Sequence, residues 1–377
     1  MKKILFISHD AHLAGAQILL LNLLKWIKKN HCDIQFDVLL TGEGILTADF
    51  ENITNVLKIP LPKERATSLD KIIYKLRLKK FYHNACNKKY HLVYNNTFSN
   101  GELLSILKHN KMPIITHVHE LEYWIKKNGA ENENHIKSST NYYLTASMSV
   151  RDYLLKNNIA DANNVEVVYE WIDSQFLLNQ KENKSIKSFL NLPENSIIIA
   201  ASGRENFRKG KDWFIPIAIQ VLTKMKSKKI HFVWIGGHTT EELVFDCIKS
   251  GFRNNIHFIE HMPEANFYFN ELEIFMMLSR EDPFPLVNLE AAIWEVPVIC
   301  FENTGGTEEL VSENCGIKVP YGNLNMFSEA IIRVMADKEF KYEIGRNIKE
   351  KVLKEYDINV VGEKIVRAIF KVIKNHE

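Results

Sequence analysis

The sequence lacks the features that define several common protein classes. Its five cysteines are odd in number, scattered, and free of any C-x-x-C pair (Cys32, Cys86, Cys247, Cys300, Cys315). This pattern provides neither a cysteine zinc site nor a disulfide framework, and it is typical of a reducing compartment. No stretch approaches the roughly 18 apolar residues of a spanning helix. The apolar run Ile4 to Ile7 is too short for a signal peptide and predicts a first β-strand, so we expect a cytoplasmic protein.

A large excess of charge is also missing. The formal net charge is +2 over 377 residues, which argues against a dedicated nucleic-acid binder. No G-x-x-x-x-G-K-[ST] and no G-x-G-x-x-G occurs, so a P-loop and a dinucleotide fingerprint are both absent. The length exceeds that of one ordinary core and predicts two domains.

Short apolar runs alternate with stretches of helical period along the whole chain. The runs are KILFIS, FDVLLT, HLVYNN, PIITHVH, YYLTAS and VEVVYEW, then SIIIAAS, IHFVWIG, IHFIEH, IFMMLS, VPVICF and GIKVP. Helical period lies between them, as in Gln17 to Lys28 and Asp212 to Met225. Near-continuous apolar strands separated by helices predict α/β domains with parallel sheets covered on both faces. The polar stretch Asp173 to Glu194 is the expected boundary, and a last helix spans Asp357 to Lys374.

Charged and glycine-bearing loops follow four of the strands predicted in the second half. Ligands of open α/β sheets bind at the carboxyl ends of the strands, so these loops mark the candidate site. The first loop offers glycines, arginines and lysines before a helix, a composition suited to phosphate. Its members are Gly203, Arg204, Arg208, Lys209, Gly210 and Lys211. The alternative is a solvated basic turn.

The stretch SREDPFPLVNLEAA (279–292) places two acids eight residues apart, Asp282 before a helix and Glu290 within it. Carboxylates so placed can accept hydrogen bonds from vicinal hydroxyls of a sugar or ribose. Alternatively, Asp282 caps the helix and Glu290 faces solvent. Gly305 and Gly306 in NTGGTEEL precede another helix and offer backbone N–H groups to an anion or hydroxyl, or else form a plain tight turn.

In the first half, Gly15 and Ala16 open the first helix, and THVHELE places His117, His119 and Glu120 at the end of a strand. His-x-His can be a metal pair, but no clear third ligand is present. His119 is otherwise a polar contact to a ligand or a structural histidine. Residues 71–89 hold seven Lys or Arg among apolar residues, a pattern of a solvated face or of a contact with anionic lipid headgroups.

These motifs together resemble the retaining glycosyltransferases of the GT-B fold, specifically the group 1 glycosyltransferases of family 4. The most specific part is the E-x7-E motif, onto which Asp282 and Glu290 fall, with Phe284 on its aromatic and Leu286 on its leucine. ASGRENFRKGKDWF is similar to the family's G-R-x-x-x-x-K-G segment through Arg204 and Lys209. NTGGTEELV matches the glycine-glycine loop, LAGAQILLLNL the N-terminal glycine loop, and HVHELE the loop of the active-site histidine.

The resemblance implies two Rossmann-like, doubly wound domains facing each other across a cleft. Residues 1–175 would bind the acceptor, residues 176–356 the sugar nucleotide, and the helix of residues 357–377 would return to the N-terminal domain. It implies sugar transfer with retention of configuration from a nucleoside-diphosphate sugar to a glycan or lipid-linked acceptor, as in cell-surface polysaccharide synthesis. No divalent metal or other cofactor is expected, the nucleotide sugar being a co-substrate. Peripheral contact of the N-terminal domain with the inner face of an anionic membrane is a further expectation.

The resemblance also assigns roles to individual residues. Arg204 and Lys209 would neutralise the leaving diphosphate, and His119 would contact the sugar near its anomeric carbon, so that these three and Asp282 form the expected catalytic set. The expected donor-binding set adds Gly15, Ala16, Gly203, Phe284, Pro285, Leu286, Val287, Glu290, Gly305 and Gly306.

Three residues depart from the family pattern. Asp282 replaces the usual Glu, Pro285 replaces a glycine and removes an N–H, and Ala14 stands where a glycine is common. These departures leave the donor sugar open. They also motivate a different class of function, a non-catalytic sugar-nucleotide-binding member of a glycan-assembly complex. A GT-B epimerase or phosphorylase is a further alternative.

Overall fold

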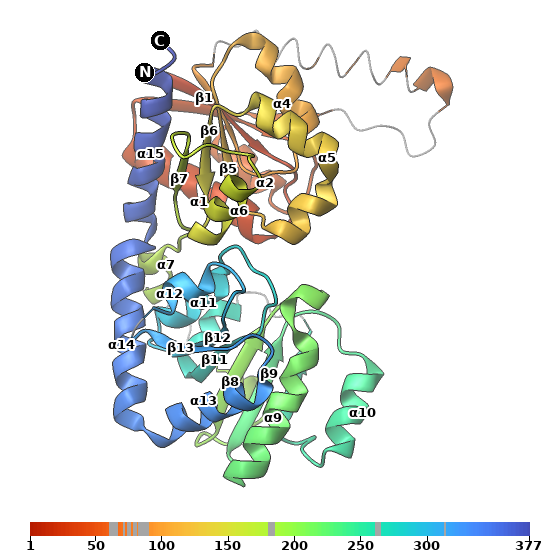
Figure 1. Ribbon diagram of the computed structural model, residues 1–377, viewed down its shortest axis with the longest axis vertical. Coiled ribbons are helices and arrows are strands. Elements are labelled where there is room, and N and C mark those ends of the chain that lie inside the picture. The colour runs from red at the N-terminus through yellow and green to blue at the C-terminus, as the bar shows by residue number, and fades with distance from the viewer. Residues whose placement is uncertain are drawn as a thin grey trace. The chain divides into compact units, whose positions relative to one another are not determined.

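The chain folds into two compact units, each built on a parallel β-sheet (Figure 1). The computed structural model describes residues 1–59, 67–70, 72–73, 77, 81, 90–179, 185–260, 265–312 and 314–377. The first unit comprises residues 1–170 and 358–377, and the second comprises residues 171–357. The boundaries predicted from sequence followed residues 175 and 356.

The first unit holds a seven-stranded sheet of order β3-β2-β1-β4-β5-β6-β7, in which all pairs are parallel. Its strands are β1 Lys2–Ser8, β2 Ile34–Leu40, β3 Val56–Lys58, β4 Leu92–Asn95, β5 Ile114–Val118, β6 Tyr142–Thr145 and β7 Val165–Val167. Its helices are α1 Gly15–Asn30, α2 Thr47–Ile53, α4 Gly101–Leu107, η1 Lys108–Asn110, α5 Glu122–Ser139, α6 Met148–Lys156 and α15 Ile358–Lys374. Strands β4 and β5 are buried throughout and β1 is buried from Ile4 onward, as expected of a parallel sheet covered on both faces.

The second unit repeats this architecture with six parallel strands of order β10-β9-β8-β11-β12-β13. The strands are β8 Ile197–Ser202, β9 Ile230–Ile235, β10 Ile256–Ile259, β11 Leu272–Met277, β12 Val298–Phe301 and β13 Gly316–Val319. The helices are α7 Ser174–Leu178, α8 Ile186–Phe189, η2 Phe207–Lys209, α9 Lys211–Met225, α10 Glu241–Lys249, η3 Ala265–Glu271, α11 Leu286–Ala292, α12 Thr307–Leu310, α13 Leu324–Ala336 and α14 Lys338–Glu355. One buried cluster of aliphatic and aromatic side chains joins α9 and α13 to the sheet.

The last helix, α15, belongs to the first unit although the whole second unit precedes it in the chain (Figure 1). It packs on α1, where the indole of Trp26 donates to Asn359 Oδ1 at 2.9 Å. Gly362 lies against the same ring, since a Cβ there would come within 2.7 Å of Trp26. Its opposite end is held by Lys371 Nζ, which donates to the Tyr142 hydroxyl at 2.8 Å. A glycine therefore sets how closely the two helices approach.

Each of the twelve strand runs predicted from sequence overlaps a strand of the structure. The predicted helices Gln17 to Lys28 and Asp212 to Met225 lie within α1 and α9, and the last helix is α15. The three-residue strand β3 was missed, because Val56–Lys58 is too short to show a period.

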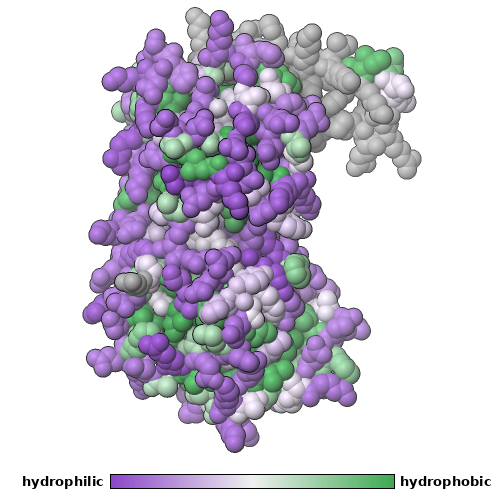
Figure 2. All heavy atoms as spheres, in the orientation of Figure 1, coloured by the Kyte–Doolittle hydropathy of each residue, from purple (hydrophilic) through white to green (hydrophobic). Residues whose placement is uncertain are grey.

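Polar side chains cover most of the face that Figure 2 shows, on both units, and hydrophobic side chains appear between them in small groups. In the part of the chain that the structure describes, no helix combines the length and the apolar character that crossing a membrane requires. Most of the lysine-rich stretch 71–89 lies outside the described residues.

Candidate functional site

Two loops of the second unit meet at the carboxyl edge of its sheet. The basic loop, residues 203–211, follows β8, and the acidic loop, residues 278–285, follows β11. β8 and β11 are adjacent and parallel, so their carboxyl ends lie side by side. The topology therefore brings together two stretches that are more than 60 residues apart in sequence.

The acidic loop places the Asp282 carboxylate against the cations of the basic loop. Its Oδ2 lies 2.5 Å from Lys209 Nζ and 3.3 Å from Arg208 Nη1. Ser279 Oγ donates to the same oxygen at 3.3 Å, and Asp282 is only 6% exposed. Burial alone would raise the pKa of this carboxyl group, but Lys209 and Arg208 outweigh burial and hold it below its usual value. Asp282 is therefore ionised at neutral pH, and the alternative that it caps α11 is wrong.

Glycines allow the two loops to touch. Gly210 has φ +69°, and a Cβ on it would lie 2.1 Å from the carbonyl oxygen of Leu278. A Cβ on Gly203 would lie 3.0 Å from the side chain of Lys209. Both positions of the predicted glycine pattern are thus explained by close approach of neighbouring groups.

The arginine that faces Asp282 is Arg208, which the sequence analysis included in the loop but did not assign to the diphosphate pair. Arg208 Nη1 also donates to the backbone carbonyl of Glu281. Arg204, the predicted partner of Lys209, lies exposed between β8 and η2. The signal for Arg208 was present in the sequence as an Arg–Lys pair, but only the one-turn helix η2 shows that both side chains reach the acidic loop.

Glu290 lies on α11, and its surroundings are unusual for a carboxyl group. No hydrogen bond or ion pair reaches its carboxylate from the residues that the structure describes. The side chain retains some exposed surface, yet burial raises its pKa to about 7. An acceptor group without a protein partner is suited to hydroxyl donors of a ligand.

The loop before α12 completes this edge of the sheet. Asp282 N–H donates to Thr304 O at 2.7 Å, and Gly306 N–H donates to the carbonyls of Asp282 and Pro283 at 3.1 and 3.0 Å. Gly305 has φ +119°, and a Cβ there would lie 1.9 Å from Asp282 O. The expectation of a free N–H is therefore wrong for Gly306, because that group already holds the acidic loop.

The remaining residues of the motif have mixed environments. Phe284 is 2% exposed and stacks on Tyr356 with ring centroids 5.3 Å apart, so its side chain is part of the core. Pro285 is the residue before α11 and provides no side-chain cap, while Leu286 and Val287 form the partly exposed first turn.

In the first unit, His119 lies in a polar cluster at the carboxyl edge of the sheet. Its Nδ1 lies 3.2 Å from Glu170 Oε1, and its Nε2 lies 3.1 Å from Asn96 Oδ1. Burial, assisted by the charge of His9, lowers the pKa of His119 to about 3, so its ring is neutral at pH 7. A neutral ring has one N–H, and the carboxylate of Glu170 is its stronger acceptor. Glu170 thereby orients the ring.

The neighbouring His117 is engaged inside the protein. Its Nδ1 lies 2.6 Å from the Tyr94 hydroxyl, and its Nε2 lies 3.3 Å from Val168 O. Both ring nitrogens thus have protein partners, which leaves neither for a metal pair with His119. Among the described residues, no three His, Cys, Asp or Glu side chains gather in a way that could hold a metal ion.

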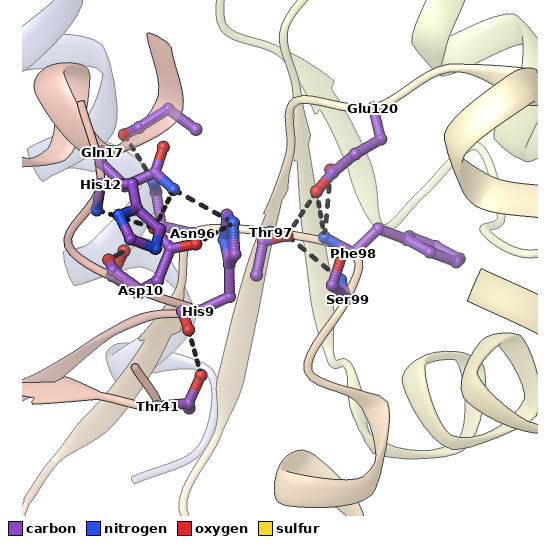
Figure 3. Close-up of polar contacts among 12 residues, drawn as sticks. His9, Asp10, His12, Gln17, Thr41, Asn96, Thr97, Phe98, Ser99 and Glu120 are labelled. Carbon is purple, nitrogen blue, oxygen red and sulfur yellow. Dashed lines mark hydrogen bonds and ion pairs between the residues drawn. The ribbon is translucent and has the colours of Figure 1, made fainter. Parts of the chain in front are cut away.

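Figure 3 shows the polar residues around this edge, with His9, Asp10, Gln17 and Asn96 gathered together and Glu120 bound to the turn of residues 97–99. The start of α1 belongs to the first group, since Asn96 Nδ2 donates to Ala16 O at 2.8 Å. Gly15, the first residue of α1, is exposed. His9 Nδ1 is buried and has no hydrogen-bond partner among the described residues. Asn96, Gln17 and His9 were not predicted, because isolated polar residues after a strand or in the first turn of a helix form no motif.

Comparison with known proteins bears on the second unit most directly. Residues 182–351 match the model of the family described as glycosyl transferases group 1. The capsular polysaccharide biosynthesis glycosyltransferase CapM of Staphylococcus aureus is 23% identical over 227 residues, which are 59% of either chain. The O-antigen biosynthesis glycosyltransferase WclY of Escherichia coli is 28% identical over 35% of this chain and 36% of its own. The aligned part is thus 59% of the length of CapM and about a third of that of WclY.

Solved structures resemble nearly the whole chain. HepE of Anabaena in complex with UDP-glucose superimposes with a TM-score of 0.82 at 17% identity, covering 98% of this chain and 100% of that one. WaaG, a glycosyltransferase involved in lipopolysaccharide biosynthesis, has a TM-score of 0.71 at 12% identity, covering 96% and 98%. The predicted GT-B fold of two Rossmann-like domains is confirmed.

Proposed function

Since the second unit carries a glycosyl transferases group 1 domain over residues 182–351, we propose that the protein transfers a sugar from a nucleoside-diphosphate sugar to a glycan or lipid-linked acceptor. The observation that carries this proposal is the convergence of Lys209 and Arg208 on Asp282 at the carboxyl edge of the second sheet. A cationic pair held in place before any ligand arrives is suited to the charge of a leaving diphosphate.

Four parts of the predicted donor site have roles that their positions support. Lys209 binds the diphosphate while remaining next to Asp282, and Arg204 adds charge from the exposed part of the same loop. Glu290 accepts hydrogen bonds from the ribose hydroxyls, a role suited to a carboxylate that has no partner among the described residues. The first turn of α11 contacts the donor sugar through its backbone.

In the first unit, the neutral ring of His119, oriented by Glu170, contacts the sugar near its anomeric carbon. The loops at the same edge of the first sheet, residues 41–49 and 94–101, bind the acceptor. With a neutral histidine as its contact, the acceptor hydroxyl passes its proton to the departing diphosphate, which is consistent with retention of configuration.

The donor and the biological setting are proposed by similarity. HepE was solved with UDP-glucose, and CapM is named for capsular polysaccharide biosynthesis. We therefore place a UDP-sugar first among donors to be tried and a cell-surface polysaccharide among products.

Membrane association through residues 71–89 is tested by liposome flotation. Binding that depends on neither lipid charge nor salt would contradict an electrostatic contact.

A donor panel tests the core of the proposal. UDP-, GDP- and dTDP-sugars are each incubated with lipid-linked and free glycan acceptors, and release of the nucleoside diphosphate is measured. We expect release with at least one donor, a product of unchanged anomeric configuration by NMR, and no loss of rate when EDTA is added. If no donor and acceptor pair released the nucleoside diphosphate, the result would contradict the proposed transferase activity and favour a protein that binds the nucleotide without turnover. Product analysis separates transfer from epimerisation.

A further inference from the structure

Arg280 joins the basic loop to the acidic loop, and neither the motifs nor the resemblance assigned it a role. Its guanidinium lies 3.9 Å from the ring centroid of Phe207 and 3.9 Å from that of Trp213. Its side chain is 11% exposed although it is charged. Both aromatic rings therefore lie at cation–π distance from a flat guanidinium, a stacking contact that suits arginine better than lysine.

The edges of the same guanidinium are also occupied. Nη1 and Nη2 donate to the two carboxylate oxygens of Asp212 at 2.8 and 2.6 Å, and Nη1 donates to Phe207 O at 2.6 Å. The bond to Arg280 raises the acidity of Asp212, whose pKa lies below its usual value. A forked, charge-assisted pair of this kind fixes direction as well as distance. The aromatic contacts and the hydrogen bonds together restrict rotation of the Arg280 side chain.

The backbone of Arg280 continues this connection toward the cations. Its N–H donates to Arg208 O at 2.7 Å. The start of the acidic loop is thus bonded to the residue before Lys209. On the other side of Arg280, Glu281 O accepts from Arg208 and Asp282 binds Lys209. The contacts of Arg280 therefore help to fix the positions of both cations, Arg208 and Lys209.

We propose that Arg280 is a positioning residue for diphosphate binding, which acts by holding the Phe207–Lys209 turn so that the Lys209 ammonium faces the ligand. This inference rests on the proposed function, because it concerns the same ligand. Arg280 itself is committed to Asp212, Phe207 and Trp213 and does not touch the diphosphate. Its effect on binding must therefore pass through Lys209.

A double-mutant cycle tests this dependence. The affinity for UDP and for GDP is measured by calorimetry for the wild type, Arg280→Met, Lys209→Met and the double variant. We expect Arg280→Met to weaken diphosphate binding about tenfold in the wild-type background and by less than twofold in the Lys209→Met background. Arg280→Lys, which keeps the charge but not the fork or the flat stacking, should give an intermediate loss.

The controls separate positioning from stability. Arg333→Met removes an exposed guanidinium that lies 4.3 Å from the Phe340 ring in the same unit, and it should leave UDP affinity unchanged. If Arg280→Met fails to fold, Asp212→Asn replaces it in the cycle, because this change at an exposed carboxylate removes the fork and leaves both rings. Equal losses in both backgrounds would overturn the role of Arg280 while leaving the proposed function intact. If the wild type binds neither diphosphate, the proposed function fails and this inference fails with it.

Discussion

Glu290 combines a partly exposed carboxyl group with a pKa raised to about 7 by burial. The folded state thus favours the protonated form, whose contribution to stability is present below pH 4.5 and is lost as the pH rises through 7. Ribose hydroxyls, in contrast, donate best to the ionised form. With the proposed role of Glu290 in ribose binding, nucleotide binding would therefore depend on pH around neutrality.

We expect the affinity for the nucleotide to rise about tenfold between pH 6 and pH 8, because the ionised fraction of Glu290 rises by that factor. Calorimetric titrations at several pH values measure this dependence. The phosphate groups titrate in the same range, so the matched comparison is Glu290→Gln, which should show a much flatter profile. Identical profiles for the two proteins would show that Glu290 does not bind the ribose.

Lys209 is the residue whose removal should cost the most activity. Lys209→Ala deletes the ammonium that faces Asp282 and leaves a buried carboxylate whose remaining cation, among the described residues, is Arg208. We expect turnover to fall about 100-fold or more, as when one group that stabilises developing negative charge is removed. The steady-state rate with the best donor measures it. Arg204→Ala is the informative partner, and a wild-type rate there would assign the arginine role to Arg208.

At the scale of elements, the strands and helices were predictable because each carries a regular apolar pattern over several residues. For the loops, the sequence predicted their positions in the chain but not the contacts of their side chains. Arg280 looked like one more charged residue of the acidic loop, since its contacts with Phe207, Asp212 and Trp213 come from another strand-to-helix connection. Likewise, the choice between Arg204 and Arg208 depends on the three residues of η2, which have no periodic signature.

The contact between the basic and acidic loops provides a prediction at this scale. Gly210→Ala places a methyl group about where Leu278 O lies, at 2.1 Å, in addition to the strain of φ +69°. Gly251→Ala is a matched control, with φ +80° but nothing within 4 Å of its Cβ. We expect Gly251→Ala to lower the free energy of unfolding by about 1 kcal/mol and Gly210→Ala by about 3 kcal/mol or more. Urea denaturation measures both, and equal losses would mean that the loops separate without cost.

For the whole molecule, the fold class followed from the alternation of strands and helices and from motifs that recur at several strand ends together. The residues around His119 did not follow, because Asn96, Gln17 and Glu170 come from separate elements and share no spacing. The same holds for Gly306, whose N–H is used by the neighbouring loop rather than by a ligand. Sequence patterns locate the carboxyl edge of each sheet. Which residues contact one another at that edge is seen only in the structure.

Buried histidines predict how the stability of the molecule depends on pH. Burial lowers the pKa of His119 to about 3 and of His257 to about 4, and it also lowers those of His117 and His231. The unfolded chain binds protons at these sites near pH 6.5 and the folded protein does not, so stability is full above pH 6.5 and is lost as the pH falls toward 4.

Urea unfolding at pH 7.5 and pH 5.5 should therefore show a clear loss of stability at the lower pH, of at most about 1.4 kcal/mol per pH unit for each histidine. His257 lies on β10, away from the basic and acidic loops. The His257→Gln variant should therefore lose less stability at the lower pH and keep its affinity for UDP. An unaltered pH dependence in that variant would mean that His257 is protonated in the folded protein.

The position of α15 imposes an order on biosynthesis. Helix α15, which packs on α1 around Trp26, leaves the ribosome only after every strand of the second sheet has emerged. The second unit is continuous and can complete its core during translation, whereas the first must wait with Trp26 and its neighbours uncovered. The first unit is thus completed only after the second has been synthesised, and its uncovered surface around Trp26 is where chaperones would have most to protect.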